Sequence, residues 1–588
     1  MYTKEYPTKD KTDHRIYIYR SIPGQKEREI VERIPSKNGI REKYGDVDAY
    51  IKSRIEELSG RIEDKKKDKV SLIIDLEKKI DLSKGDLSNS RNAGYLFLQK
   101  AYYDLGIDLF LSKWKFTSKA NFKYSLNDVF RFLVYARVED PGSKLALSRK
   151  NADYLEEFDF SVDDIYDCLD RIDQFSEAMT RKLSGKCSSL IKPEGDSIYY
   201  DCTNFYFEIQ NADGEDGLRD YGVEKNHRPD PIVEYGLLMD EGGFPIGSTI
   251  FRGGQSEKTS LVPLLKNAGE DITKAKIIVA DNGLNCENNK KAIHDSGRNY
   301  IFCQSPKQLS EANLEPLFED KDWLHYDTGK KVKSWWIKRT NGRDERLVAR
   351  FDKASYDFMN KVINNRVERA KKFIANPSKL NLSNCKDGKQ YIKKIVTDKK
   401  TGEVIKAKSY LELLTEEIEK DRKYAGYILY VTDIPRVKDD EDGSFTKMKA
   451  LGYRVVFQDD LEIVKVAGRR TDIEDCFRTM KSGLDARPMF VYKKEHIAAH
   501  LFTVYVALTL LMYIKRKYVK ELTNQQLLDA VRKYTLCSIG DEKDVYATGF
   551  YDGGIDALAK SMGFEGMDRE YLERKTIKKF IAYSKKVS

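Results

Sequence analysis

Three acidic residues stand in sequence contexts that could bring their carboxylates together. Asp201 lies inside an apolar, β-rich stretch, Asp281 follows the run 277–280, and Glu474 lies in a segment with helical periodicity. A carboxylate in a strand needs a partner, because burying it unpaired is costly. Two aspartates on strands and one glutamate on a helix are a set that could hold a pair of Mg²⁺ ions for chemistry at phosphorus.

The residues around Asp281 predict the carboxyl end of a buried strand. Four apolar residues precede it, and Asn282 and Gly283, which favour a turn, follow it. α/β sheets place functional groups at such strand ends. Two ordinary alternatives remain open: Asp281-Asn-Gly could be only a turn, and Asp201 could be a core acid that accepts hydrogen bonds from Thr203 or a backbone amide.

The segment around Glu474 predicts an amphipathic helix. At 100° per residue, the charged residues within about 40° of Glu474 are Arg470, Arg478, Lys481 and Asp485. The apolar residues on the adjoining face are Ile473, Cys476, Phe477, Met480 and Leu484. Lys481 would lie about 10 Å beyond Glu474 along the axis, which suits a phosphate contact next to a metal site. Alternatively, Thr471 and Glu474 form a capping box, which would remove Arg470 from the charged stripe.

The order of these residues resembles that in the DDE transposases of bacterial insertion sequences that carry a Tyr-x2-Arg-x3-Glu-x6-Lys signature. Arg470, Glu474 and Lys481 match the Arg, Glu and Lys at the right spacings, and Ala467 stands in place of the Tyr. The resemblance extends from about Asn92 to the C-terminus. The other segments that carry it are Asp201–Glu208, Arg228–Asp230, Tyr235–Pro245, Leu484–Pro488 and His500.

The resemblance implies an α/β fold. Its catalytic core would be a ribonuclease H-like mixed sheet, with a helical N-terminal region and an α+β insertion domain between the second Asp and the Glu. Asp201, Asp281 and Glu474 would be catalytic and would bind Mg²⁺, with Mn²⁺ able to substitute. The residues expected to contact DNA are Arg470, Arg478 and Lys481.

The resemblance also implies a reaction and its partners. The expected activity is cleavage of double-stranded DNA at the terminal inverted repeats of the element, followed by transfer of the freed 3′-hydroxyl to target DNA. Synapsis of two ends implies a homodimer. Two alternatives stay open: a ribonuclease H-like nuclease without strand transfer, and an inactive, domesticated DNA-binding relative.

The spacing of the three acids predicts a large insertion. About 190 positions separate Asp281 from Glu474, far more than a short connection requires. We expect a charged N-terminal region over 1–91, a helical DNA-binding region over 92–192, the first part of the core over 193–306, the insertion domain over 307–453, the second part of the core with the Glu helix over 454–515, and a helical C-terminal region over 516–588.

Two charged stretches predict exposed helices. The residues from Lys26 to about Lys84 alternate in charge, and Asn364–Lys372 in the insertion is basic and amphipathic. The resemblance would make the insertion, with Trp323, Trp335 and Trp336, a region that grips the element's end. The simpler interpretation is a solvated helix beside a small tryptophan core.

Composition permits nucleic-acid binding without requiring it. The 588 residues include 104 basic and 95 acidic side chains, a net charge of +9, so phosphate binding would depend on local patches. The eight cysteines form no CxxC pair, and with the six histidines they show no zinc-binding spacing. Reduced thiols and a charged N-terminus favour a cytoplasmic location. The resemblance implies a bacterial, nucleoid-associated protein.

The apolar run 500–514 predicts a buried core helix in preference to a membrane span, because it is short and begins with His500. We therefore expect no membrane partner. His496 and His500 share a face of this helix, where a packing or phosphate-facing role is expected.

Overall fold

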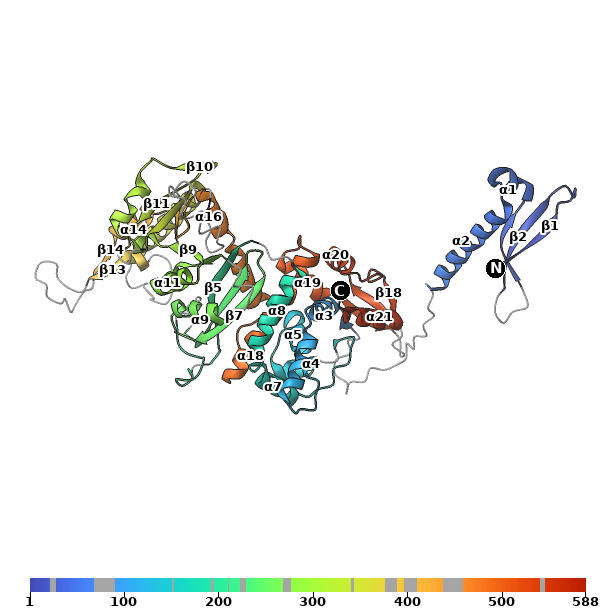
Figure 1. Ribbon diagram of the computed structural model, residues 1–588, viewed down its shortest axis with the longest axis horizontal. Coiled ribbons are helices and arrows are strands. Elements are labelled where there is room, and N and C mark those ends of the chain that lie inside the picture. Colours follow the sequence, from blue (N-terminus) through green and yellow to red (C-terminus); the bar gives the residue numbers. More distant parts are fainter. Residues whose placement is uncertain are drawn as a thin grey trace, which may run out of the picture. The chain divides into compact units, whose positions relative to one another are not determined.

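The chain forms two compact units. The computed structural model describes residues 1–21, 28–67, 90–150, 153–191, 195–209, 211–222, 229–267, 276–339, 343–375, 389–395, 410–436, 457, 459–539 and 545–587. The first unit is Met1–Leu87, and the second contains Ser88–Ile539 and Lys543–Ser588 (Figure 1). The fold of the second unit is mixed α/β and is built around a large mixed sheet.

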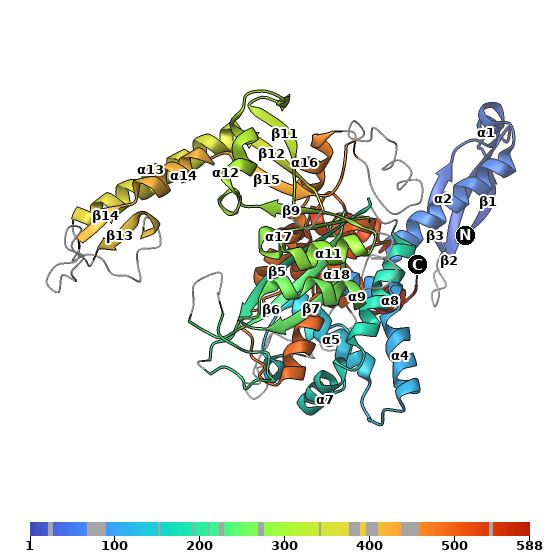
Figure 2. The same cartoon turned by 60° about the vertical axis from the view of Figure 1, so that its left-hand side comes forward.

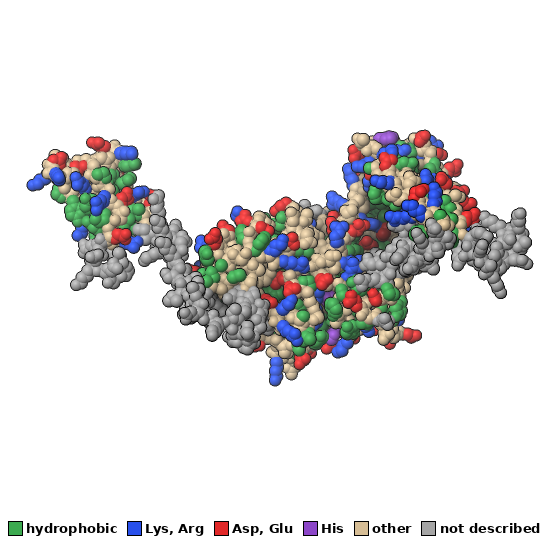
Figure 3. All heavy atoms as spheres, turned by 180° about the vertical axis from the view of Figure 1, so that it is seen from behind, with side chains coloured by type: hydrophobic (Ala, Val, Ile, Leu, Met, Phe, Trp, Pro, Cys, Tyr) green, Lys and Arg blue, Asp and Glu red, His purple; other side chains and the backbone are tan. Residues whose placement is uncertain are grey.

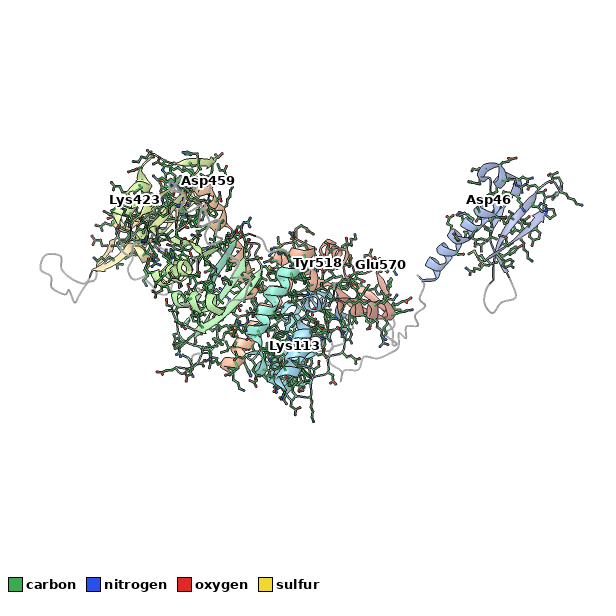
Figure 4. All side chains as sticks on the ribbon, in the orientation of Figure 1. Asp46, Lys113, Lys423, Asp459, Tyr518 and Glu570 are labelled. Carbon is green, nitrogen blue, oxygen red and sulfur yellow. The ribbon has the colours of Figure 1, made fainter. Side chains whose placement is uncertain are left out.

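The first unit contains an antiparallel sheet that charge alternation alone did not predict. Its strands and helices are β1 (Tyr2–Pro7), β2 (His14–Ser21), β3 (Arg28–Ile34), α1 (Lys37–Tyr44) and α2 (Val47–Lys67). Ile16 and Ile18 are fully buried, and this two-residue period is what makes β2 a strand with one face on the core. The carboxylate of Asp46, labelled in Figure 4, accepts hydrogen bonds from the amides of Asp48 and Ala49 and so caps α2.

The large sheet of the second unit contains nine described strands in the order β10-β11-β12-β15-β9-β8-β5-β6-β7. In chain order they are β5 (Ser197–Tyr206), β6 (Ile232–Asp240), β7 (Pro245–Arg252), β8 (Ile277–Ala280), β9 (Asn299–Gln304), β10 (Leu324–Asp327), β11 (Lys330–Ile337), β12 (Glu345–Asp352) and β15 (Tyr427–Thr432). β5, β8 and β9 run parallel to one another, whereas the other neighbouring pairs are antiparallel.

Helices from both ends of the chain pack together beside this sheet. The N-terminal ones are α3 (Tyr95–Asp104), α4 (Ile107–Ser118), α5 (Leu126–Glu139), α6 (Lys144–Ser148), α7 (Val162–Ile172) and α8 (Ser176–Leu190). α3, α5, α7 and α8 contact α18 (Lys494–Tyr518), which also contacts β7. The buried apolar side chains of these helices and of the sheet form one continuous core.

α18 is the central helix of that core. Among the described helices it is long and apolar enough to cross a membrane, but 94% of its most apolar stretch is buried inside the protein. Such burial is consistent with the core helix of a soluble protein, as the sequence predicted.

The C-terminal region contains strands as well as the helices that were expected. β16 (Thr535–Ile539), β17 (Val545–Phe550) and β18 (Tyr571–Glu573) form a sheet with β4 (Ser90–Asn92). The helices there are α19 (Asn524–Lys533), α20 (Gly553–Ser561) and α21 (Arg574–Ser584). β16 alternates between half-buried and buried positions, the two-residue period of a strand. Pairing of β16 with β4 joins the two ends of the unit.

The inserted residues extend the large sheet. β15 returns beside β9, and β12, β11 and β10 continue outward from β15. α13 (Lys353–Ala375) and α14 (Thr415–Lys423) lie side by side and lead away from the sheet to β13 (Ile392–Ile395) and β14 (Tyr410–Leu413) (Figure 2). These elements have a small core of their own, which includes Ile363, Val367 and Tyr391.

The remaining described helices connect or cover the strands of the large sheet. They are α9 (Leu261–Asn267), α11 (Glu287–Asp295), α12 (Glu311–Leu314), α16 (Asp460–Gly468) and α17 (Thr471–Arg478). The expected boundary at 453–454 lies outside the described residues.

A buried ion pair fixes the start of α16 to the sheet. Arg346 of β12 is fully buried, and its guanidinium contacts the carboxylate of Asp460 in the first turn of α16. Arg346 Nε also donates to Ile434 O at 2.9 Å, and Asp460 accepts from Ser334 Oγ at 2.8 Å. The neighbouring Asp459, labelled in Figure 4, caps the helix by accepting from the Leu461 amide at 2.8 Å. α16 therefore begins at a fixed point on the strands of the insertion.

Replacing Arg346→Met is expected to lower the free energy of unfolding by about 3 kcal/mol. Asp460 would lose its closest cation and keep only Arg436, at 3.4 Å, and the hydrogen bond from Ser334. Urea unfolding of the full chain, followed by tryptophan fluorescence, measures this. The control is Lys353→Met, which removes an ion pair to Asp357 whose side chains are 57% and 59% exposed. That change is expected to cost less than about 1 kcal/mol. Equal losses in the two variants would contradict the role given to the buried pair.

Candidate catalytic site

The register of the parallel strands brings Asp201 and Asp281 side by side. Tyr200 of β5 pairs with Ala280 of β8, so the two aspartates are the next residues of neighbouring strands. The backbone of Asp281 is still extended, with φ −79° and ψ 170°. Residues at one level of parallel strands point to the same face, and the strands lie about 4.8 Å apart. The two carboxylates therefore start from adjacent points at the carboxyl end of the sheet.

Cys303 continues this row on the third parallel strand. Ala280 of β8 pairs with Phe302 of β9, which makes Cys303 the next residue beside Asp281. Sequence reasoning missed this cysteine. The signal that could have found it is the alignment of the three apolar strand segments, since Asp201, Asp281 and Cys303 each follow the buried row by one residue.

Each aspartate is also held by the backbone. Asp201 Oδ1 accepts from the Cys202 amide at 2.8 Å, and Asp281 Oδ1 accepts from the Asn282 amide at 2.7 Å. Asn282–Leu284 is a single 3₁₀ turn that begins at Asp281. The turn that was considered as an alternative for Asp281 is therefore present, and it orients the carboxylate at the strand end.

Glu474 lies on α17, which contacts β5. The helix starts at Thr471 with no side-chain cap, so the alternative capping box of Thr471 and Glu474 does not form. All five residues predicted for the apolar face are buried: Ile473, Cys476, Phe477, Met480 and Leu484. That prediction is confirmed, and packing of this face against the sheet leaves Glu474, with a side chain 52% exposed, on the open side.

Arg470 connects the strand acids to the helix acid. Its Nη1 lies 2.5 Å from Asp281 Oδ1, and its Nη2 lies 3.3 Å from Glu474 Oε1. Nη1 also lies 3.6 Å from Cys303 Sγ. The predicted proximity of Arg470 and Glu474 on one helix face is confirmed, although Arg470 stands at the residue just before the helix.

The charges around Arg470 shift the pKa values of its neighbours. Burial raises the pKa of Asp281, but the positive charge of Arg470 and the Asn282 amide outweigh burial, and the pKa lies below its ordinary value. Desolvation lowers the pKa of Arg470, but nearby negative groups, including Asp281 and Asp201, raise it overall. Burial raises the pKa of the Cys303 thiol to about 12, so this cysteine is protonated at neutral pH.

The carboxylates are of the kind that Mg²⁺ prefers, but Arg470 lies between two of them, Asp281 and Glu474. Across the described ranges, no group of three or more His, Cys, Asp or Glu side chains is close enough to hold one metal ion. Carboxylate oxygens are the hard ligands that Mg²⁺ prefers, and the side chains of Asp281 and Glu474 are 44% and 52% exposed. Binding of a cation by these acids requires that Arg470 first release them.

The charged stripe predicted along the Glu474 helix is interrupted. Thr479–Gly483 forms a π-type turn in which the Leu484 amide donates to Thr479 O at 2.7 Å, five residues back. The 100° rule therefore fails after Arg478, and Asp485, with φ 47°, is outside the helix. The prediction that Asp485 continues the stripe is wrong.

The two expected DNA-contacting residues beyond Glu474 lie in different settings. Arg478 ends α17 with a side chain 75% exposed and pairs with Asp475 at 2.9 Å. Lys481 is half-buried within the π-type turn. Figure 3 shows basic and acidic side chains interspersed over the face in view, as a net charge of only +9 would suggest. Arg228, which contributed to the resemblance, lies outside the described residues.

No protein-family model matches the chain, and no curated protein matches it significantly. The fold and the site by themselves define an α/β protein with two aspartates side by side at the carboxyl ends of parallel strands. Arg470 connects one of them, Asp281, to Glu474 of α17.

Removing the bridge with Arg470→Gln is expected to lower the melting temperature on the order of 2 °C at neutral pH, without divalent cations. The folded pKa of Asp281 is below its unfolded value, so this ion pair stabilises the protein at higher pH. The difference between variant and wild type should therefore disappear as the pH falls through the depressed pKa of Asp281. Melting curves over a pH series measure this.

The matched control is Arg478→Gln, which removes the exposed ion pair to Asp475 on the same helix. Its melting temperature is expected to stay close to that of the wild type. A pH-independent difference for Arg470→Gln would contradict the assigned ion pair with Asp281.

Proposed function

We propose that the protein is a DDE transposase that cleaves DNA at the ends of an insertion sequence and joins them to target DNA. The observation that carries the proposal is the position of Asp201 and Asp281 side by side on parallel strands, with Glu474 connected to Asp281 through Arg470. The sequence, with its Arg-Glu-Lys spacing, led us to expect this arrangement of two acids on strands and one acid on a helix.

We propose further that the core is ribonuclease H-like. The order of elements supports this: the strand of Asp201 is followed by two antiparallel strands, a helix, and then the parallel strand that ends at Asp281. The insertion would be the DNA-gripping region of such an enzyme. Its helix α13 includes Asn364–Lys372, whose buried members Val367 and Ala370 leave the basic side chains to the outside.

In this proposal Asp201, Asp281 and Glu474 would hold Mg²⁺, or Mn²⁺ in its place. When bound, the metal supplies the positive charge that activates a water or a 3′-hydroxyl and stabilises the leaving oxygen. Asp201, on the strand beside that of Asp281, would supply a further carboxylate to the metal. Arg470 leaves the acids and pairs with a phosphate, which is a better partner for its planar guanidinium once the carboxylates are neutralised.

The partners follow from this chemistry. The substrates would be double-stranded DNA of the terminal inverted repeats and of the target, and joining two ends calls for a homodimer. Arg478 and Lys481 would contact backbone phosphates beside the acids. A bacterial cytoplasm, at the nucleoid, is where these substrates occur.

The decisive experiment is joining of a labelled element-end duplex to a plasmid in Mg²⁺, with the full chain. Asp201→Asn, Asp281→Asn and Glu474→Gln are each expected to reduce joining at least about a hundredfold, because each removes charge that the metal site needs. DNA binding, measured by mobility shift, should be kept. The control is Asp472→Asn, an exposed acid on the same helix, which should leave joining unchanged.

The same assay separates the alternatives. Cleavage without joining would indicate a ribonuclease H-like nuclease. Binding without either reaction would indicate an inactive DNA-binding relative, in which the Arg470 ion pairs persist. Joining that survives any of the three substitutions would refute the assigned acids.

A contact between Lys481 and a phosphate predicts a change in salt dependence. Lys481→Ala is expected to weaken duplex binding and to reduce the slope of log affinity against log salt by about 0.9, the effect of one phosphate contact. Fluorescence anisotropy over a KCl series measures the slope. An unchanged slope would show that Lys481 is not a phosphate contact.

A further inference from the structure

Two basic side chains are buried together on the helical side of the core. Arg137 of α5 and Lys144 at the start of α6 are 3% and 4% exposed, and His500 of α18 lies with them at 5%. Among the residues that the structure describes, neither of the two basic side chains has a carboxylate within 4.0 Å. Burial lowers the pKa of Arg137, and the acid whose negative charge opposes this shift is Asp485, which is exposed. Burial, followed by the positive charge of Arg137, lowers the pKa of Lys144 well below its ordinary value. An anion in contact with both side chains would supply the negative partner that this arrangement lacks.

The hydrogen bonds of Arg137 are incomplete. Its Nη1 donates to the carbonyls of Asp485 and Leu484 at 3.3 and 3.5 Å, and its Nη2 donates to Gly142 O at 3.5 Å. All three are longer than ordinary hydrogen bonds to a carbonyl. Within the described part of the chain, Arg137 Nε is buried and has no partner at all. Main-chain oxygens therefore hold the guanidinium in place, and its Nε can still donate a hydrogen bond to a further acceptor.

His500 is an uncharged neighbour of this pair and contacts Arg137. Its Nε2 lies 3.3 Å from the Ala486 carbonyl and must donate to it, so Nδ1 carries a lone pair and accepts from Arg137 Nη2 at 3.5 Å. Burial, followed by the charges of Arg137 and Lys144, lowers the pKa of His500 well below its ordinary value. His500 orients the guanidinium and contributes no charge.

The three side chains line a small cavity. It has a volume of about 20 Å³ and is also lined by Gly142, Ser143, Asp485 and Phe490. Phe490 is 54% exposed, so the cavity reaches the surface at that side. This volume accepts about one water-sized group, hence one oxygen atom but not a whole phosphate ion.

We propose that this cavity binds a single anionic oxygen of a DNA backbone phosphate, with Lys144 and Arg137 as its charged partners. A phosphodiester on a bound strand can insert one oxygen while the rest of the group stays at the rim. This site deepens the proposed function and rests on it for the source of the phosphate. Since Arg137 also holds the carbonyls of Leu484 and Asp485, an occupied cavity would fix the segment that follows Lys481.

The first test compares full-length wild type with Lys144→Met in binding to a labelled duplex over a KCl series. We expect the salt slope to fall by about 0.9 and the affinity at 0.1 M salt to fall about eightfold, the loss of one phosphate contact. The control is Lys113→Met, the same change at an exposed position of α4 (Figure 4), which should leave slope and affinity unchanged. Equal slopes for wild type and Lys144→Met would overturn the proposal.

A second arm distinguishes DNA from free phosphate. Inorganic phosphate at constant ionic strength is expected to leave the melting temperature of the wild type unchanged, because a free ion that inserts one oxygen lacks the other contacts that hold a bound strand in place. If phosphate raises the melting temperature of the wild type but not of Lys144→Met, and the DNA slopes are equal, the site serves a free anion and the proposal fails.

A further variant covers the case in which Lys144→Met does not fold. Ser143→Asp keeps a side chain that can cap α6, where Ser143 Oγ now accepts from the Ala146 amide at 3.2 Å, and places a carboxylate at the cavity. It should reduce the DNA slope by the same amount, and a wild-type slope would overturn the proposal. These readouts need no joining activity, so a protein that binds DNA without joining it would refute the proposed function and leave this site standing.

Discussion

The parallel pairing of β5, β8 and β9 is the constraint on which the candidate site depends. Tyr200, Ala280 and Phe302 share one buried row, and the next residue of each strand forms a second row at the carboxyl ends. A shift of one residue would turn these side chains to the opposite face of the sheet. The apolar residues of the first row keep the register, so the acids stand at the edge of a packed core. α17 then needs only to lie across β5 to bring Glu474 to the same edge.

Electrostatics explains why an arginine lies among these acids. Neighbouring carboxylates repel one another, and Arg470 offsets that repulsion by pairing with Asp281 and Glu474. The same pairing competes with any other cation for those oxygens. A metal ion must therefore bind more favourably than the guanidinium does, and a nearby phosphate lowers this requirement by offering Arg470 another partner. Within the proposed function, binding of DNA would therefore favour binding of the metal, because a phosphate draws Arg470 away from the carboxylates.

Local periodicity was sufficient to predict the strands that carry the two aspartates and the buried face of α17. It could not predict the π-type turn at Thr479–Gly483, because helix arithmetic assumes constant geometry and a single extra residue in one turn rotates everything that follows. The many charged residues in the strands of the first unit obscured the two-residue apolar period that would have predicted them. The continuation of the sheet from β9 into β15, and the meeting of Arg137 with His500, depend on partners distant in sequence, which no local pattern contains.

The return of the inserted chain beside the strand that it leaves has an entropic consequence. β9 and β15 are neighbours, so the inserted residues amount to a loop closed at its base by main-chain hydrogen bonds. The entropy lost in closing a flexible loop grows only with the logarithm of its length, about 0.6 kcal/mol for each doubling. The protein can therefore carry a long arm such as α13 and α14 between two residues of one site with little loss of stability. The length of that arm is free to vary while the row of acids stays the same.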